Sequence, residues 1–543
     1  MTANLYPLIY SPGIQRDGTQ FQSEYCLDGQ WIRFQRGKVK KIGGMKGAIT
    51  DKGEVRVTNL TIFPLPSGRG QILILICGEQ GISAQLNSPD WVNIGWNNLL
   101  PTAVGPAVLW ESATVIDTGS NKAFIVFMQT NNALDIAQNS ASEFFSTEIS
   151  RAINSAINQN VLQGVNPLIN GGLCFAAPYL FLYGSNGLVQ YSTSNDPFDF
   201  RDDIMVEVAG PNGTRVRELS PNRGGDFTIS NDKVIYGSPI RGGSNSPSLL
   251  FWTLSSVVRV ANASIGDGEA DFKSDTISTS SSILSSKCVV EYDGLFFWPG
   301  TDRFFVYNGI VQEMDNRMNL NYFYDNIDME RRQQVFGVKN TKYGEIWWFY
   351  PVRGVAGANS RAIVYNKREN FWYDTAISRT AGVFSPDFGF MCTYGLPLVN
   401  LTGGQNIWRH ELGVVQDEAS GGGRSIAPIP SSFTTPIFSW VAFPPKPNRG
   451  SMPSQFINRW VDLQRIEPDF VTTAGVPDRF EVLVNTQEYA QSPIVTTAPV
   501  QFARNTGKLD MRVQGRNMSL TFRSIDNFEV GHIILLLGMG DAR

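Results

Sequence analysis

Short runs of apolar residues recur along most of the chain, and polar, glycine-containing segments separate them. The runs start about 44 to about 62 residues apart, close to the roughly 40–50 residues of a β-propeller blade. Their β-branched and aromatic residues favour strands. The seven runs are 72–76, 123–128, 180–183, 233–236, 295–298, 346–350 and 390–394.

Most of these runs are followed by a turn and then by a second strand in which apolar and polar residues alternate. Examples of second strands are 188–192, 303–307 and 362–365. Each unit therefore reads as a hairpin that is buried at its first strand and half exposed at its second. Because six or seven such hairpins arranged radially bury one another's faces, we predict a β-propeller-like domain over residues 51–425.

The C-terminal part of the chain has a different pattern. Gly421 to Gly423, followed by Pro428 and Pro430, predicts a flexible junction. Beyond it, alternating strands predict an antiparallel β-sandwich-like domain over residues 426–543. These strands are 437–441, 456–463, 480–484, 509–513, 519–522 and 532–537. The fold class is thus all-β.

The stretch 140–168 departs from the repeat, since Ala, Asn, Ser and Gln dominate it and glycine is absent before Gly164. This composition leaves two structures open, a helix or a polar loop inserted in a blade.

Residues 1–50 read as an extended N-terminal segment with a hairpin. Trp31, Arg33 and Phe34 place apolar and cationic side chains on an extended stretch. Gly37-Lys38 predicts a tight turn, and Gly43-Gly44 permits backbone angles that a Cβ would forbid.

Charge and cysteine content narrow the function classes. The chain has 45 Lys and Arg against 49 Asp and Glu, a net charge of −4, so a dedicated nucleic-acid binder is disfavoured. The five cysteines show no CxxC spacing, which argues against a disulfide framework. The N-terminus lacks a signal-peptide pattern, and no apolar run approaches the length of a membrane helix. We therefore expect a protein made in a cytoplasm, without a membrane-spanning segment.

Candidate catalytic and binding residues are few. His410 and His532 lie outside any recognised catalytic pattern, so we interpret both as strand histidines. Asp267 to Asp271 lacks the later Glu of an EF-hand and reads as a solvated turn. Asp196 and Asp199 suggest the paired carboxylates of a glycosidase, although Asp196-Pro197 also fits a turn. We predict no catalytic, cofactor or metal site, and no enzyme.

Two further patterns suggest ligand binding only superficially. The pair Trp347-Trp348 suggests a stacking platform for bases, but adjacent strand residues face opposite sides, so at least one must be core. Gly538-x-Gly540 is not followed by a helix, so it does not predict a phosphate site.

The segment 26–47, with Trp31-Ile32-Arg33-Phe34, Gly37 and Gly43-Gly44, resembles the opening of the tail nozzle and packaged-DNA stabilisation proteins of short-tailed bacteriophages, also called tail hub or tubular tail protein B-like proteins. Further strings in family-like order span most of the chain. They are 191–197, 250–254, 257–260, 307–309, 370–373, 379–382, 407–413, 512–516 and 540–543.

This resemblance implies a structural virion protein of the phage tail, assembled in the host bacterial cytoplasm. It implies a homo-hexamer that forms the nozzle or tail tube below the portal and its head-to-tail adaptor ring. Such a ring would retain packaged double-stranded DNA and conduct it at ejection without sequence-specific binding. Tail fibres or tailspikes, and a tail needle, would be its further partners.

Two alternatives remain open. A carbohydrate-binding or depolymerase-like tail propeller would need convergent carboxylates and aromatic residues in one pocket. A host scaffold propeller that binds peptides is the other.

Overall fold

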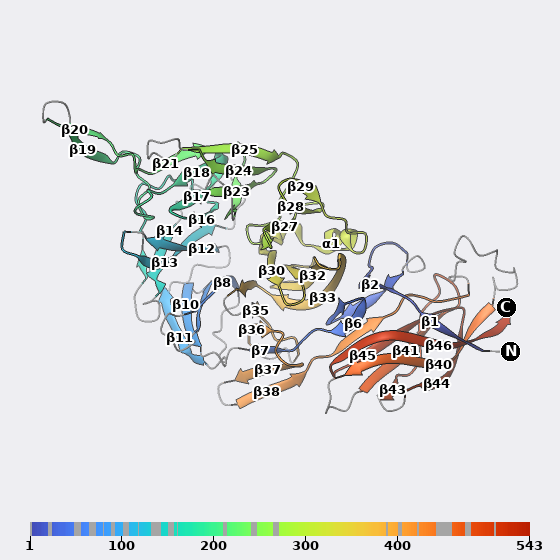
Figure 1. The fold of residues 1–543 in the computed structure, drawn as a ribbon. Helices are drawn as coiled ribbons and strands as arrows, with labels where there is room; N and C mark the ends of the chain where they lie inside the picture. Colours follow the sequence, from blue (N-terminus) through green and yellow to red (C-terminus); the bar gives the residue numbers. More distant parts are fainter. Residues whose placement is uncertain are drawn as a thin grey trace.

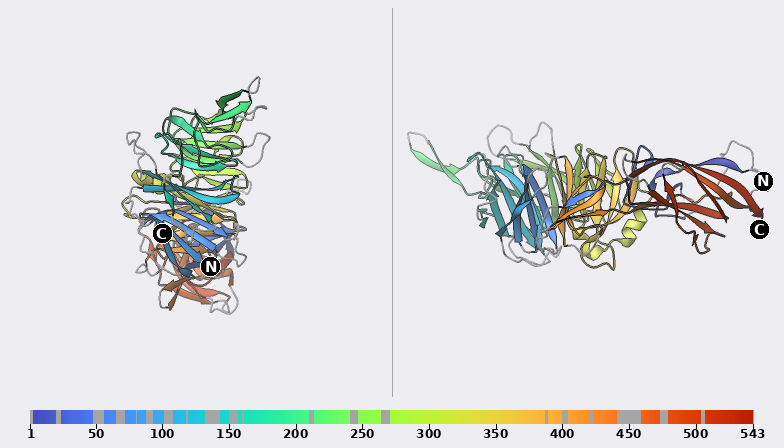
Figure 2. Two further views of the ribbon diagram at one scale, coloured as in Figure 1. Left: turned by 90° about the vertical axis from the view of Figure 1, so that its left-hand side faces the viewer. Right: turned by 90° about the horizontal axis from the view of Figure 1, so that it is seen from below.

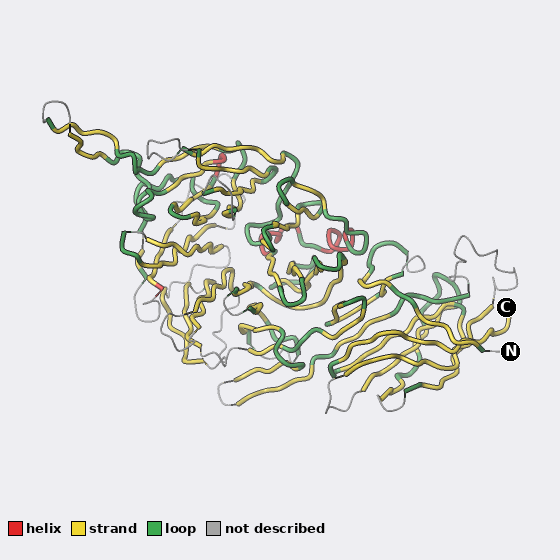
Figure 3. Tube along the Cα trace, viewed as in Figure 1, coloured by secondary structure: helices red, strands yellow, loops and turns green. Residues whose placement is uncertain are grey.

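The computed structural model describes most of the chain, and its described part is almost entirely β (Figure 3). The predicted all-β class, with a propeller-like domain and an antiparallel sandwich, is confirmed. The described residues are 3–19, 24–47, 56–64, 72–79, 81–87, 93–100, 108–117, 119–131, 143–149, 157–159, 161–209, 214–240, 247–263, 271–386, 389–399, 404–420, 423–440, 459–472, 479–503 and 507–542.

Seven sheets, antiparallel except for the parallel pair of β7 and β37, form the propeller-like domain (Figure 1). Their innermost strands β8, β12, β16, β22, β26, β30 and β34 follow one another around the centre, and β34 returns to contact β8. The fourth and fifth sheets meet through Trp252 and Trp298, whose rings lie 5.6 Å apart. The domain therefore closes on itself with seven blades.

Each blade is built from strands that are consecutive in the sequence, apart from the third, in which the hairpin of β19 and β20 is inserted before the last strand, and the seventh. The strands of each sheet are given from the innermost outward. The first sheet contains β8 (Val57–Pro64), β9 (Ile72–Gly78), β10 (Gly81–Asn87) and β11 (Asn93–Leu100), and the second contains β12 (Val108–Asp117), β13 (Lys122–Asn131), β14 (Glu143–Glu148) and β15 (Asn158–Gln159). The third contains β16 (Gly172–Ala176), β17 (Tyr179–Tyr183), β18 (Leu188–Tyr191) and β21 (Gly225–Thr228), and the fourth contains β22 (Val234–Pro239), β23 (Ser248–Thr253), β24 (Val257–Asn262) and β25 (Phe272–Ser278).

The fifth and sixth sheets are β26 (Val290–Tyr292), β27 (Leu295–Pro299), β28 (Phe304–Tyr307) and β29 (Val311–Glu313); β30 (Phe336–Asn340), β31 (Glu345–Tyr350), β32 (Asn359–Asn366) and β33 (Phe371–Arg379). The seventh comprises β34 (Ala381–Ser385), β35 (Phe390–Gly395), β36 (Asn406–His410), β7 (Met45–Gly47), β37 (Val415–Ser420) and β38 (Gly423–Pro428). Because β7 comes from the N-terminal part, it ties the start of the chain to the last blade.

Six of the seven predicted apolar runs form the second strand of a blade rather than its first. The exception is 233–236, which lies at the innermost strand β22, while β23 is the second strand of that blade. Second strands are covered on both faces by neighbouring blades, so they are apolar throughout instead of alternating. In β9, for example, every residue is buried.

Two further expectations concern stretches that the structure describes only in part. The helix considered for 140–168 is replaced, in the described residues, by β14 and β15, because Phe144 and Phe145 are both buried on opposite faces of a strand. The flexible junction predicted at Gly421 to Gly423 lies mostly outside the described residues, and the strands on either side of it, β37 and β38, pair from Val415↔Pro428 to Ser420↔Gly423.

The sandwich consists of two sheets that combine both ends of the chain. One contains β44 (Leu509–Gly515), β40 (Arg459–Thr472), β46 (Phe528–Ala542), β6 (Lys38–Lys41) and β5 (Ile32–Gln35), with β1 (Asn4–Leu8) also on β46; the other contains β4 (Asp28–Gln30), β39 (Ser431–Thr434), β45 (Asn517–Ser524), β41 (Arg479–Gln487) and β42 (Val495–Thr496), with β43 (Val500–Ala503) also on β41. The N-terminal segment is thus divided between the sandwich and the propeller-like domain.

The remaining elements are short. They are the parallel pair β2 (Ser11–Ile14) and β3 (Tyr25–Cys26), the separate hairpin β19 (Met205–Ala209) and β20 (Arg215–Leu219), the helix α1 (Leu320–Asn326), and the 3₁₀ turns at Ser185–Gly187 and Met329–Gln334. The sandwich and both chain ends lie at one end of the elongated molecule, and β19–β20 projects at the other (Figures 1 and 2). No helix in the described ranges is long and apolar enough to cross a membrane.

The predicted N-terminal hairpin is confirmed, with its turn one residue earlier than expected. β5 and β6 pair around Arg36-Gly37, whose φ angles are 54° and 72°, as in the type I′ turn of a two-residue hairpin. Gly43 and Gly44 do not have positive φ. Gly44 is required by space instead, because a Cβ there would lie 2.3 Å from the Val415 carbonyl oxygen.

Candidate functional site

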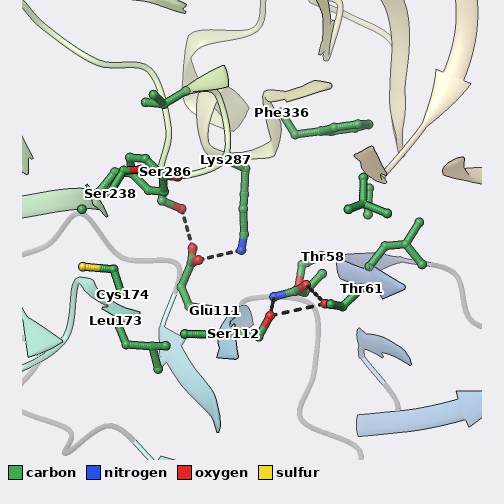
Figure 4. Close-up of a pocket in the computed structure, with 18 of the residues that line it drawn as sticks. Thr58, Thr61, Glu111, Ser112, Leu173, Cys174, Ser238, Ser286, Lys287 and Phe336 are labelled. Atoms are coloured by element: carbon green, nitrogen blue, oxygen red, sulfur yellow. Dashed lines mark hydrogen bonds and ion pairs between the residues drawn. The ribbon is translucent and has the colours of Figure 1, made fainter. Parts of the chain in front are cut away.

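Two regions gather charged groups in the interior, and the first is the central cavity of the propeller-like domain. The cavity encloses about 410 Å³ and is lined by residues at or beside the innermost strands of all seven sheets (Figure 4). Representative lining residues are Thr58, Glu111, Leu173, Ser238, Lys287, Phe336 and Ala381. A cavity of this size suits a small molecule rather than a polymer.

An ion pair bridges this cavity. Lys287 Nζ lies 2.6 Å from Glu111 Oε2, and Ser286 Oγ donates to Glu111 Oε1 at 2.7 Å (Figure 4). Glu111 belongs to the second sheet, whereas Ser286 and Lys287 immediately precede the fifth. Since the Glu111 side chain is only 7% exposed, the pair is largely shielded from water and links two sheets across the ring.

A neutral network lines the neighbouring wall. Asn59 Nδ2 donates to the Trp110 carbonyl at 3.3 Å and to Ser112 Oγ at 2.9 Å, and Thr61 Oγ1 donates to Asn59 Oδ1 at 3.2 Å. These bonds join the first and second sheets. Together with the ion pair they hold the polar groups of the cavity in contact with one another.

This arrangement does not resemble a glycosidase site. Glycoside hydrolysis commonly uses two carboxylates about 5 to 9.5 Å apart, and among the described residues that line the cavity Glu111 is the one carboxylate. Its oxygens are engaged by Lys287 and Ser286. Within the described ranges, no group of three or more His, Cys, Asp or Glu side chains is placed to hold a metal ion.

The second region lies where the segment 26–47, which we call the strap, crosses the sixth and seventh sheets. Arg33, in β5, is 1% exposed. Its Nε lies 3.0 Å from Glu345 Oε1 and its Nη2 lies 2.5 Å from Glu411 Oε1. The guanidinium carbon lies 3.5 Å from the centroid of the Tyr343 ring, a cation–π arrangement. A single strap residue thus forms ion pairs with two propeller carboxylates.

Glu345 is fully buried and has further donors. Tyr373 Oη donates to its Oε1 at 2.8 Å and Trp347 Nε1 donates to its Oε2 at 3.1 Å. Burial raises the pKa of Glu345, and the Arg33 guanidinium opposes that rise. Burial opposes the charge of Arg33, but Glu345 and Glu411 together hold the Arg33 pKa well above its ordinary value.

The rest of the strap follows β33, the outermost strand of the sixth sheet. Trp31 N donates to Thr375 Oγ1 at 3.1 Å, and the Phe34 ring lies 5.6 Å from the Phe371 ring. Trp31 and Phe34 are fully buried within the chain, in a core that includes residues of both the sandwich and the sixth sheet. The strap therefore joins the sandwich to the propeller-like domain through one continuous hydrophobic core.

A second buried ion cluster strengthens this joint just before the strap. Asp374 is 1% exposed and accepts from Arg16 Nε at 3.0 Å, while Arg361 contacts its other oxygen. Arg16 Nη2 also lies 2.7 Å from Asp28 Oδ1. The cluster fixes the N-terminal segment on β33 from a second direction.

The histidines take structural positions. His410 is buried at the end of β36, with its Nε2 2.7 Å from Thr393 Oγ1. Burial, with Arg379 and Arg33 nearby, holds the pKa of His410 well below its usual range. His532 is exposed on β46 and lies in the sandwich, away from the seventh sheet that holds His410.

The other candidates are also accounted for by local structure. Asp196 accepts from Phe198 N at 2.8 Å and Asp199 pairs with Arg201 at 2.7 Å, so both belong to a turn. Trp347 and Trp348 are both fully buried, and all five cysteines are buried and form no disulfide. Gly538 and Gly540 lie inside β46. Most of the segment from Asp267 to Asp271 lies outside the described residues.

Glu111 and Lys287 were not identifiable from the sequence. They are 176 residues apart, and neither belongs to a motif. The one sequence feature that points to this pair is Glu111 itself, a charged residue that directly follows a tryptophan in an apolar strand.

Comparisons with known proteins add little. No family model matches the chain, and no curated protein matches it. Similar solved structures include the computationally designed Ika8 protein (10% identity, 68% of this chain and 99% of that chain, TM-score 0.33). Another is an ancestral GH74 enzyme (13% identity, 72% of this chain and 51% of that chain, TM-score 0.37). A third is BBS1N in complex with ARL6DN (8% identity, 67% of this chain and 94% of that chain, TM-score 0.36). With TM-scores below 0.5, we draw no functional conclusion from them.

Proposed function

We propose that this chain is a structural subunit of a short bacteriophage tail, a nozzle or tail-tube protein that assembles as a ring of six below the portal and adaptor. One observation carries the proposal. The strap, whose residues most closely resemble the tail family, is also the segment that joins the sandwich to the propeller-like domain through buried Trp31, Arg33 and Phe34. The residues that resemble the family thus coincide with the segment whose buried contacts join the two domains.

The central cavity supports a role for the propeller-like domain as a rigid body rather than as the DNA conduit. The cavity encloses about 410 Å³ and the Glu111–Lys287 pair bridges it. Duplex DNA, whose major groove alone is about 12 Å wide, does not fit such a space. In the proposed assembly the conduit lies between subunits, on the axis of the ring.

The charge of the chain is compatible with a conduit. A wall that lets DNA slide past should not retain the polyanion through many phosphate contacts. The net charge of −4 provides no overall cationic excess for such contacts.

A deletion tests the proposed function. In phage particles assembled without this chain, we expect filled heads that lose their DNA and do not infect, because nothing seals the portal. Supplying the chain from a plasmid should restore both retention and infection. Particles that retain their DNA and inject it normally without the chain would contradict the proposal, and loss of adsorption with normal DNA retention would favour the depolymerase-like alternative.

A further inference from the structure

The central cavity of the propeller-like domain has the dimensions of a small-molecule site. Its volume of about 410 Å³ lies within the range of about 300–1,000 Å³ that is usual for ligand sites. Residues at or beside the innermost strands of all seven sheets line it, so the ring of blades would surround a bound molecule. A purely structural role for the subunit leaves the chemistry of this space unexplained.

The described lining of the cavity is neutral as a whole. Glu111 and Lys287 are its two charged residues, and they pair with each other at 2.6 Å. An ionic ligand would add an uncompensated charge beside a Glu111 side chain that is 7% exposed. Such a charge is unfavourable where water is largely excluded, so the cavity favours a neutral molecule.

The ion pair keeps hydrogen-bonding capacity beyond its internal contact. An ammonium group has three protons, and among the described residues its acceptor is Glu111 Oε2 at 2.6 Å. Because the Lys287 side chain lines the cavity and is 26% exposed, its other protons are accessible to a ligand. An ionised carboxylate accepts about four hydrogen bonds, so Glu111 can take more than those from Lys287 and Ser286.

Hydroxyl groups on the adjoining wall add donors. Ser112 Oγ accepts from Asn59 Nδ2 at 2.9 Å and lies 3.4 Å from Thr61 Oγ1, which is longer than the roughly 2.5–3.0 Å of an ordinary bond between two hydroxyl groups. Thr58 Oγ1 accepts from the Trp110 backbone N–H at 3.2 Å. Within the described part of the chain, the protons of Ser112 and Thr58 therefore remain available to a ligand.

The arrangement of these groups indicates which kind of molecule fits. The polar side chains converge in the middle of the cavity, and apolar side chains such as Phe336 and Leu173 border them (Figure 4). Donors and acceptors thus lie side by side within an apolar frame. Since a hydroxyl group both donates and accepts, several hydroxyl groups on a carbon ring match this pattern.

We infer that the central cavity binds a neutral polyhydroxylated molecule of the size of a monosaccharide. One ligand hydroxyl accepts from Lys287 Nζ, another donates to Glu111, and a third accepts from Ser112. The ligand is bound and not cleaved, because Glu111 is the one carboxylate among the described lining residues. The site lies within a single chain, so the inference goes beyond the proposed tail role and does not depend on ring assembly.

Titration of the full chain with sugars of equal ring size and different charge tests the inference. The neutral probes are D-glucose, D-galactose, D-mannose and myo-inositol, and each pyranose is compared with its uronate. Calorimetry and saturation-transfer NMR measure binding at millimolar concentrations. We expect at least one neutral probe to bind, and any pyranose that binds to do so about tenfold or more tightly than its uronate, because the uronate brings an unpaired charge into the site.

Three variants locate the binding site, and circular dichroism confirms that each one folds. Ser112→Ala should weaken binding about three- to tenfold by removing one donor. Ser120→Ala, in the exposed turn between β12 and β13, is the matched control and should bind as the wild type does. Glu111→Gln leaves Lys287 without its counter-charge, so the preference should shift from the neutral sugar towards its uronate, which a merely structural ion pair would not produce.

Three results would overturn the inference. They are no binding by any neutral probe, tighter binding of a uronate than of its parent sugar by the wild type, and binding that Ser112→Ala leaves unchanged. If Glu111→Gln does not fold, the comparison of Ser112→Ala with Ser120→Ala still decides. Each of these results leaves the proposed function intact, because tail assembly is measured on phage particles and sugar binding on the purified chain.

Discussion

The propeller-like domain and the sandwich are both antiparallel β structures, but they are assembled in different ways. Five of the seven blades are built from strands that are consecutive in the sequence, and the third differs only by the hairpin of β19 and β20 inserted before its last strand. The sandwich pairs residues from the two ends of the chain, as in Val39↔Val530. Blades therefore form mainly through contacts between residues close in sequence, whereas the sandwich and its contacts with the strap require residues far apart in sequence to meet.

The largest expected effect comes from breaking the joint. Arg33→Met should destabilise the chain by about 3–5 kcal/mol, because Glu345 and Glu411 would lose the cation that they share. Urea unfolding followed by tryptophan fluorescence measures the loss. The control Arg317→Met, at an exposed pair, should leave the midpoint unchanged. Equal midpoints for both variants would show that the strap is not a critical joint.

The central ion pair offers a matched perturbation inside the propeller-like domain. Lys287→Met should cost about 1–3 kcal/mol, since Glu111 would keep Ser286 but lose its cation. The effect should be smaller than at Arg33, because Glu111 retains a donor. Lys122→Met, at a more exposed pair with Glu148, is the control and should cost below about 0.5 kcal/mol. If Lys287→Met lowers the free energy of unfolding more than Arg33→Met does, the central ion pair and not the strap makes the larger contribution to stability.

Acidification should weaken the seventh blade through His410. Its folded-state pKa lies well below its ordinary value because of burial, so the unfolded chain binds its proton first as pH falls. The stabilisation is fully present above about pH 6.5 and is lost below it, by at most about 1.4 kcal/mol per pH unit. The difference between the urea unfolding midpoints at pH 7.5 and pH 5.5 should be smaller in His410→Gln than in the wild type. If the midpoint falls equally between pH 7.5 and pH 5.5 in both proteins, His410 does not contribute to the loss of stability in acid.

The smallest expected effect is on catalysis. We predict no turnover of glycans, peptides or nucleotides, because the one described carboxylate of the central cavity is paired with Lys287. Assays of wild type and Glu111→Gln should give the same background. Turnover that Glu111→Gln abolishes would show that the cavity is an active site.

The same contrast explains what could be predicted from the sequence. The apolar second strands are local signals, so β9, β13, β17, β27, β31 and β35 were all anticipated. The strap was recognised as a hairpin, but not its place between β33 and β46, since those contacts join residues several hundred positions apart. Glu111 and Lys287 carry no spacing pattern for the same reason. The segment 140–168 was ambiguous because its polar composition hides Phe144 and Phe145.

The most direct test of the proposed function is electron microscopy of purified phage particles, with the tail tube reconstructed at a resolution that separates subunits. We predict six copies of this chain in one ring below the portal and adaptor, with the conduit on the ring axis and each propeller-like domain closed by its Glu111–Lys287 pair. Absence of the chain from the tail tube, or a ring of other than sixfold symmetry, would contradict the proposal.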